Sequence, residues 1–273
     1  MALLRMPVDR PAPPTRPPPG YPLGVPITAW RTVAIVYRST EARLRMGIRG
    51  RRVARAMEDD EYASTLAVLA RVPGAVQDWS DGLAALDPFE VRLAQRPLRS
   101  LSDAGGFRWW PAPRDCGREL DRHAPRGRYD AVLVVWPAPA DIPLCGWGCS
   151  IGPSDEANGA GYSAMISDQW RRYPILPDPE EGFVHEWLHQ IEARARTAGL
   201  DPDVVPPLHD AEILTSCRTT DEPPFGETYR QYHDTVETWR PWYHDWMTGR
   251  VRRPVSEGCF GLKRAHWRLL RGD

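Results

Sequence analysis

The sequence predicts an α/β or α+β fold with a mixed twisted sheet, an active-site helix packed on that sheet and a mostly helical C-terminal part. The segments RTVAIVYR (31–38) and YDAVLVVW (129–136) are β-branched and apolar, as buried strands are, and a long helical pattern begins at Asp178. With 273 residues, 42% of them hydrophobic, the chain can bury a core of catalytic size. We therefore expect one domain over residues 27–273, with the sheet before about residue 177 and the helical part after it.

A proline-rich segment, residues 1–26, precedes this domain and contains the run RPAPPTRPPPGYP. Proline fixes φ and removes a backbone donor, so this composition favours an extended polyproline II conformation. We interpret the segment as an arm or linker. The alternative is a ligand for an aromatic groove on a protein partner.

Three further elements are expected between the proline-rich arm and the long helix. The arginine-rich stretch after the first strand leads into a helix over residues 56–71, and EVRL (90–93) has the composition of a strand. GYSAMIS (161–167) is shorter and more polar than the other strands. It is therefore expected to be an edge strand.

The long helix has recognisable start and stop signals. Asp178 can be its N-cap, Pro179 suits the first helical position, and Glu181 completes an acidic cap three residues on. Gly199 can end the helix in the left-handed conformation. Residues four positions apart inside this helix lie on one face.

The chain after this helix is rich in aromatic residues. A loop, DPDVVPP, is followed by a short helix near Leu208 and a Trp- and Tyr-rich helical stretch over residues 226–248. In that stretch Trp239, Trp242 and Trp246 are spaced i, i+3 and i+7, which is typical of a buried helix face.

Charge and hydropathy disfavour several classes of partner. The formal net charge is -1, so no strong field attracts nucleic acid or an anionic membrane. No stretch reaches the roughly 18 apolar residues of a membrane helix, and the N-terminus has no apolar run of signal-peptide length. The sequence therefore predicts a cytoplasmic protein without nucleic-acid or membrane partners.

The cysteines are five in number, and none form a CxxC pair. An odd set fits neither a disulfide framework nor a cysteine-rich zinc site, which favours reduced thiols. Cys145 and Cys149 are four positions apart, but the Trp-Gly pair between them disfavours a helix that would join them. We interpret both as small apolar residues.

The decapeptide FVHEWLHQIE, residues 183–192, contains the candidate site. His185 and His189 lie one helical turn apart, so both imidazoles can bind a single Zn²⁺ at about 2.0–2.1 Å, and Glu186 between them can activate a bound water. His209 is the favoured third ligand. Glu212 is the alternative, and Asp210 is a further neighbouring carboxylate.

This HExxH arrangement resembles the zincin metallopeptidases, and the distance to a third ligand on the next helix resembles the thermolysin-like arrangement, where that ligand is a glutamate. The metzincin extension is absent, because HEWLHQIE is followed by ARARTAG. The resemblance implies a bound zinc ion, Glu186 as general base and general acid, and a cleft-lining strand at GYSAMIS that pairs with an extended peptide. It also implies an oxyanion donor in the C-terminal region; we favour Tyr243 or His244 over the neighbouring Tyr232 and His233.

The most specific function that these residues predict is a narrow-specificity zinc metallopeptidase that cleaves a peptide or another amide-containing substrate. One alternative is a zinc-dependent tailoring enzyme of a small-molecule or peptide pathway. A second is a non-catalytic binding module in which the histidine-bearing helix is structural. Metal content and hydrolysis of a general protein substrate distinguish the three.

Overall fold

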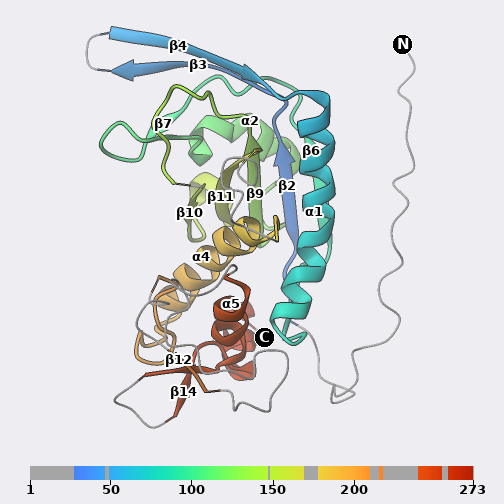
Figure 1. Ribbon diagram of the computed structural model, residues 1–273, viewed down its shortest axis with the longest axis vertical. Helices are drawn as coiled ribbons and strands as arrows, with labels where there is room; N and C mark the ends of the chain where they lie inside the picture. Colours follow the sequence, from blue (N-terminus) through green and yellow to red (C-terminus); the bar gives the residue numbers. More distant parts are fainter. Residues whose placement is uncertain are drawn as a thin grey trace.

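The computed structural model describes most of the chain after the proline-rich arm (Figure 1). The described residues are 28–46, 49–146, 148–168, 178–209, 215–217, 239–253 and 258–272. Several predictions fall outside these ranges: the arm over residues 1–26, the alternatives Asp210 and Glu212, the donor candidates Tyr232 and His233, and the helical stretch before residue 239.

The fold is a mixed sheet flanked by helices, which confirms the predicted class. The central sheet has five strands in the order β10-β11-β9-β2-β6, spanning Gly148–Ile151, Gly161–Ile166, Ala131–Trp136, Thr32–Val36 and Phe89–Leu93. β11, β9, β2 and β6 are parallel, and β10 is antiparallel to β11. Every residue of β2 and β9 is buried, as the continuous apolar runs in the sequence predict.

Helices cover both faces of this sheet. α1 (Asp59–Trp79), α4 (Glu181–Thr197), α5 (Arg240–Thr248) and α6 (Arg264–Arg271) contribute to one hydrophobic core, and α2 (Pro113–His123) contributes to the other. Alternate residues of β2 divide between them: Ala34 and Val36 face the first core, and Val33 and Ile35 face the second. Figure 1 shows α1 beside the sheet and α4 between the sheet and α5.

The remaining strands form small sheets at the periphery. Two pairs are antiparallel, β3 with β4 and β7 with β8; β1 and β5 are parallel; and β12, β13 and β14 form a three-stranded sheet. Their bounds are Thr28–Ala29 for β1, Ser39–Met46 for β3, Arg49–Ala56 for β4, Ala84–Ala85 for β5, Ser102–Asp103 for β7, Trp109–Trp110 for β8, Thr215–Ser216 for β12, Val251–Arg252 for β13 and Cys259–Phe260 for β14. A short 3₁₀ helix, η1, spans Asp155–Ala157. The arginine-rich stretch after β2 is thus the β3–β4 ribbon. These two strands were not predicted from the sequence.

The helix that contains the histidines ends as predicted and begins slightly later. Its first residue is Glu181, whose amide donates to the carbonyl of Asp178 (2.9 Å), so Asp178 lies one turn before the helix rather than at its cap. At the other end Gly199 has φ +74°, and the amide of Leu200 donates to the carbonyl of Ala195 (3.0 Å). This 6→1 bond with a left-handed glycine is a Schellman motif, which stabilises the helix C-terminus.

The prediction that GYSAMIS is an edge strand is wrong. This segment is β11, which lies between β9 and β10 and is buried along its whole length. The polar residues of this segment do not indicate exposure, because Ser163 is buried and hydrogen-bonded to the carbonyl of Glu186. The edge strand beside α4 is β10, whose residues are half-buried.

The prediction that the cysteines are reduced is also wrong for four of them. Cys145 bonds to Cys149 and Cys217 bonds to Cys259, while Cys116 is a buried free thiol. No helix is needed to bring Cys145 and Cys149 together, because Gly146 adopts φ +66° and turns the chain between them. In the described part of the chain, no helix combines the length and the apolar character needed to cross a membrane.

Candidate metal centre

Three histidines from two segments meet at one side of α4. Their potential ligand atoms all lie within 4.8 Å of one another. The Nε2 atoms of His185 and His189 are 3.1 Å apart, and the ring of His209 is centred 5.4 Å from that of His185 and 4.8 Å from that of His189. The structure therefore brings together the three predicted ligands, and their nitrogens can hold a metal ion.

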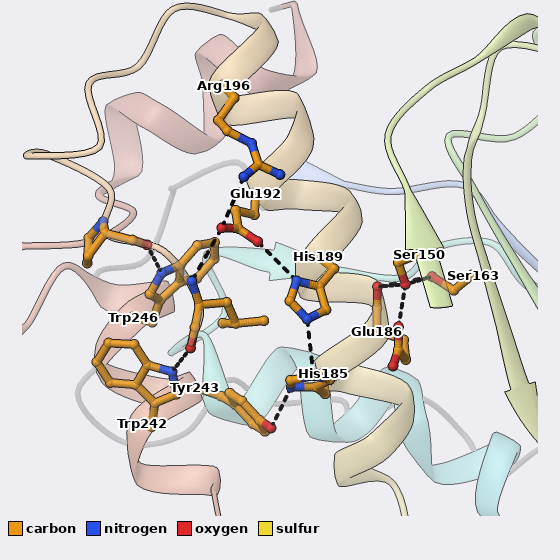
Figure 2. Close-up of polar contacts among 12 residues, drawn as sticks. Ser150, Ser163, His185, Glu186, His189, Glu192, Arg196, Trp242, Tyr243 and Trp246 are labelled. Carbon is orange, nitrogen blue, oxygen red and sulfur yellow. Dashed lines mark hydrogen bonds and ion pairs between the residues drawn. The ribbon is translucent and has the colours of Figure 1, made fainter. Parts of the chain in front are cut away.

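Each histidine of α4 has a second partner on its other ring nitrogen (Figure 2). His185 Nδ1 lies 2.9 Å from the hydroxyl of Tyr243, and His189 Nδ1 lies 3.0 Å from Oε2 of Glu192. The carboxylate of Glu192 accepts from Nδ1 of His189 and so sets the tautomer of that ring, whereas the hydroxyl of Tyr243 can donate or accept and holds the orientation of the His185 ring. In both rings Nε2 lies on the side where the two histidines meet. This arrangement is the usual one around a metal-binding imidazole.

Glu192 also connects the two segments that supply the histidines. Its Oε1 accepts a hydrogen bond from the amide of Leu208 (3.4 Å), next to His209, and lies 3.6 Å from the guanidinium of Arg196. Burial raises the pKa of Glu192, but the hydrogen bond from His189 and the charge of Arg196 outweigh it, so that the pKa is lowered. Glu192 is therefore a carboxylate that orients one ligand and anchors the segment of another.

The environment of His185 favours a neutral imidazole. Burial is the main cause that holds its pKa well below the usual value, and the neighbouring His189 and His209 act in the same direction. A metal ligand must be unprotonated at the nitrogen that binds. His185 is thus in the state that metal binding requires.

Glu186 points to the sheet side of α4 and is buried there, with 4% of its surface exposed. The hydroxyl of Ser150 donates to its Oε2 (2.5 Å), and Ser163 on β11 lies 2.7 Å from Ser150. Burial raises the pKa of Glu186, and the bond from Ser150 opposes that rise. These contacts hold the carboxylate in one position beside the two histidines (Figure 2).

Close approach of β10 to α4 depends on two glycines. A Cβ at Gly148 would lie 2.7 Å from Cδ of Glu186, and a Cβ at Gly152 would lie 2.8 Å from Cβ of Ala193. Both distances are shorter than side chains tolerate. Gly148 and Gly152 therefore allow β10 and the residue after it to pack against the helix, and this strand is a wall of the site.

A pocket of about 690 Å³ opens over these residues. Its lining includes the three histidines, Glu186, β10 and both cysteines of the Cys145–Cys149 disulfide. Arg108 and Arg196 also line it. The pocket is large enough for a ligand of several residues or a small molecule.

Tyr243 and His244, the predicted oxyanion donors, do not line this pocket. Tyr243 is fully buried, and its ring centroid lies 6.1 Å from that of Trp79 and 6.1 Å from that of Trp239. Its hydroxyl contacts Nδ1 of His185, the ring nitrogen that faces away from His189. His244 bonds through Nε2 to Asp81 (2.9 Å), away from the other histidines. Neither side chain lies at the pocket surface, and the hydroxyl of Tyr243 instead contacts Nδ1 of His185.

Sequence reasoning missed three contributors. Glu192 follows His189 by three positions, a spacing that places both on one helix face, and this signal was readable. Ser150 lies on β10, and the disulfide joins β10 to the segment just before it; no local pattern connects this part of the chain with the helix.

Comparison of the chain with protein-family models, with curated proteins and with solved structures gave no match. The function is therefore inferred from the site itself.

Proposed function

We propose that this protein is a zinc-dependent metallopeptidase of narrow specificity, with His185, His189 and His209 as the metal ligands and Glu186 as general base. The observation that carries this proposal is the convergence of three imidazoles on a pocket in which a buried carboxylate stands beside them. Three nitrogen ligands and an open position are the donor set of catalytic zinc sites.

His185, His189 and His209 would hold the zinc ion, which would supply Lewis acidity toward the scissile carbonyl and the attacking water. Glu186 would take a proton from the attacking water and then deliver it to the nitrogen of the leaving amine, so that the carbon–nitrogen bond breaks as a carboxylic acid and an amine form. Ser150 would keep the carboxylate of Glu186 directed at the pocket through its hydrogen bond. Tyr243 and Glu192 would hold the two imidazoles in their orientations.

A peptide is the substrate class that the pocket wall favours. β10 is an edge strand with no described strand on its outer side, and it lines the pocket beside Glu186, whose carboxylate Ser150 of β10 contacts. An extended peptide can pair with such an edge by backbone hydrogen bonds. Arg108 and Arg196 add positive charge at the pocket, which favours a substrate that carries a carboxylate nearby.

The test is digestion of a defined peptide library by the zinc-loaded full chain, with products identified by mass spectrometry. We expect cleavage at a few sequences, enriched in Asp or Glu beside the cut, and no cleavage after chelation. Cleavage that persists in the chelated protein would contradict the proposal. Cleavage of every peptide would contradict narrow specificity.

A further inference from the structure

The far edge of the central sheet carries a second feature, on β6. Figure 1 shows β6 on the side of the sheet opposite β10. The amide of Ala94 donates to the carbonyl of Val36 on β2 (2.9 Å), which fixes the even-numbered residues of this segment as those bonded to β2. In a parallel pair the alternate residues direct their N–H and C=O groups away. Phe89, Val91 and Leu93 therefore present these groups to the open edge, where none of the described strands pairs with them.

The odd-numbered side chains of β6 are apolar, and two of them are exposed. Val91 is 39% exposed and Leu93 is 47% exposed, and they are two of the four large hydrophobic residues exposed in the described part of the chain. The other two lie elsewhere: Phe107 is in the loop between β7 and β8, and Leu269 is on α6. Edge strands usually carry charges or proline that prevent pairing with other chains. β6 carries two charges, but Glu90 and Arg92 have opposite signs and already form an ion pair.

We propose that β6 is a homodimer interface, in which a second copy of the chain pairs antiparallel with it about a two-fold axis at Val91. Val91 then faces Val91 of the second copy, and Phe89 faces Leu93 of the second copy. All three odd-numbered residues form hydrogen-bonded pairs, because their N–H and C=O groups already point outward. The two sheets become one continuous sheet.

The charges of β6 select this register. Glu90 and Arg92 are an ion pair within the strand. A two-fold axis at Val91 places Glu90 opposite Arg92 of the second copy, and Arg92 opposite Glu90 of the second copy. These positions are the non-hydrogen-bonded pairs, whose side chains are closest, so opposite charges are favourable and like charges are not. The strand is thus complementary to itself in charge as well as in hydrogen bonding.

The interface is short, so the dimer is expected to dissociate on dilution. Sedimentation of the full chain over roughly a hundredfold range of concentration should show a monomer–dimer equilibrium. Arg92→Glu places Glu opposite Glu twice and should raise the dissociation constant at least about tenfold. Arg92→Glu is the cleaner single change, because Glu90 also lies 3.5 Å from Arg128.

The exchange Glu90→Arg with Arg92→Glu restores both opposite pairs and should restore dimerisation. Leu269→Glu, at an exposed apolar site on α6, is the matched control and should leave the equilibrium unchanged. Val91→Lys is a second disrupting variant that leaves the bonds to β2 in place. A wild type that remains monomeric throughout, or a dimer that Arg92→Glu and Val91→Lys both leave intact, overturns the proposal. The dimer does not require zinc, so this result and the hydrolase proposal fail independently.

Discussion

Glu186→Gln is expected to lower the turnover number on any cleaved peptide by about 10²- to 10⁴-fold, the range that a general base contributes. Glutamine keeps the size of the side chain and can still accept the hydrogen bond from Ser150, but it cannot take a proton from water. Glu186 is not one of the three proposed metal ligands, so the zinc content of the variant should equal that of the wild type. The measurements are kcat on the best library peptide and the zinc-to-protein ratio of the same sample.

Glu180→Gln is the control for this variant. Glu180 lies just before α4, forms an ion pair with Arg71 (3.1 Å) and does not line the metal pocket, so its loss should leave kcat unchanged. A Glu186→Gln protein that retains its zinc and most of its activity would contradict the assignment of Glu186 as the general base. A variant that loses zinc as well would show that Glu186 acts on the metal site and not on the proton.

The Cys217–Cys259 disulfide is expected to contribute about 2–4 kcal/mol to the free energy of unfolding. The bond joins the chain at a separation of 42 residues and connects the segment after β12 to β14, within the small C-terminal sheet. A cross-link over a loop of this length lowers the entropy of the unfolded chain substantially. Replacing both residues by serine should therefore lower the denaturant midpoint and the melting temperature.

The matched control is the double serine variant at Cys145 and Cys149, whose separation is only 4 residues. The chain-entropy argument gives this shorter loop a smaller effect on the free energy of unfolding. The Cys145–Cys149 disulfide borders the metal pocket, so its removal should instead change KM for the library peptide. Equal stability of the wild type and the Cys217/Cys259 variant would mean that the C-terminal sheet is held without the cross-link.

Local patterns predicted the central elements of this fold. The apolar runs of β2 and β9 identified buried strands, and the start and stop signals around α4 placed His185 and His189 inside a helix. Strand order was not predictable in the same way, because β11 and β10 differ little in composition while one is internal and the other is at the edge. Sheet order depends on contacts between distant segments, and polarity is an unreliable guide to them when a serine such as Ser163 is buried and bonded.

In the site, too, local patterns predicted some residues, and contacts between distant segments determined the others. The four-residue spacing of His185 and His189 and the intervening Glu186 were readable from the sequence, and His209 was found by its distance along the chain. The hydrogen bond from the amide of Leu208 to Glu192, which connects the segment of His209 with α4, is a contact that no periodicity reveals. The disulfides were missed because the odd number of cysteines concealed two complete pairs and one buried thiol.

The most direct test of the metal centre is the zinc content of the full chain purified without added metal, measured by inductively coupled plasma mass spectrometry. We expect about one zinc per chain, loss of that zinc in His185→Ala, and affinity weakened by about 10- to 100-fold in Glu192→Gln. His266→Ala, on α6 and outside the pocket, should keep full occupancy. Wild-type protein that contains no zinc and binds none when zinc is added would contradict the metal centre and the hydrolase proposed from it.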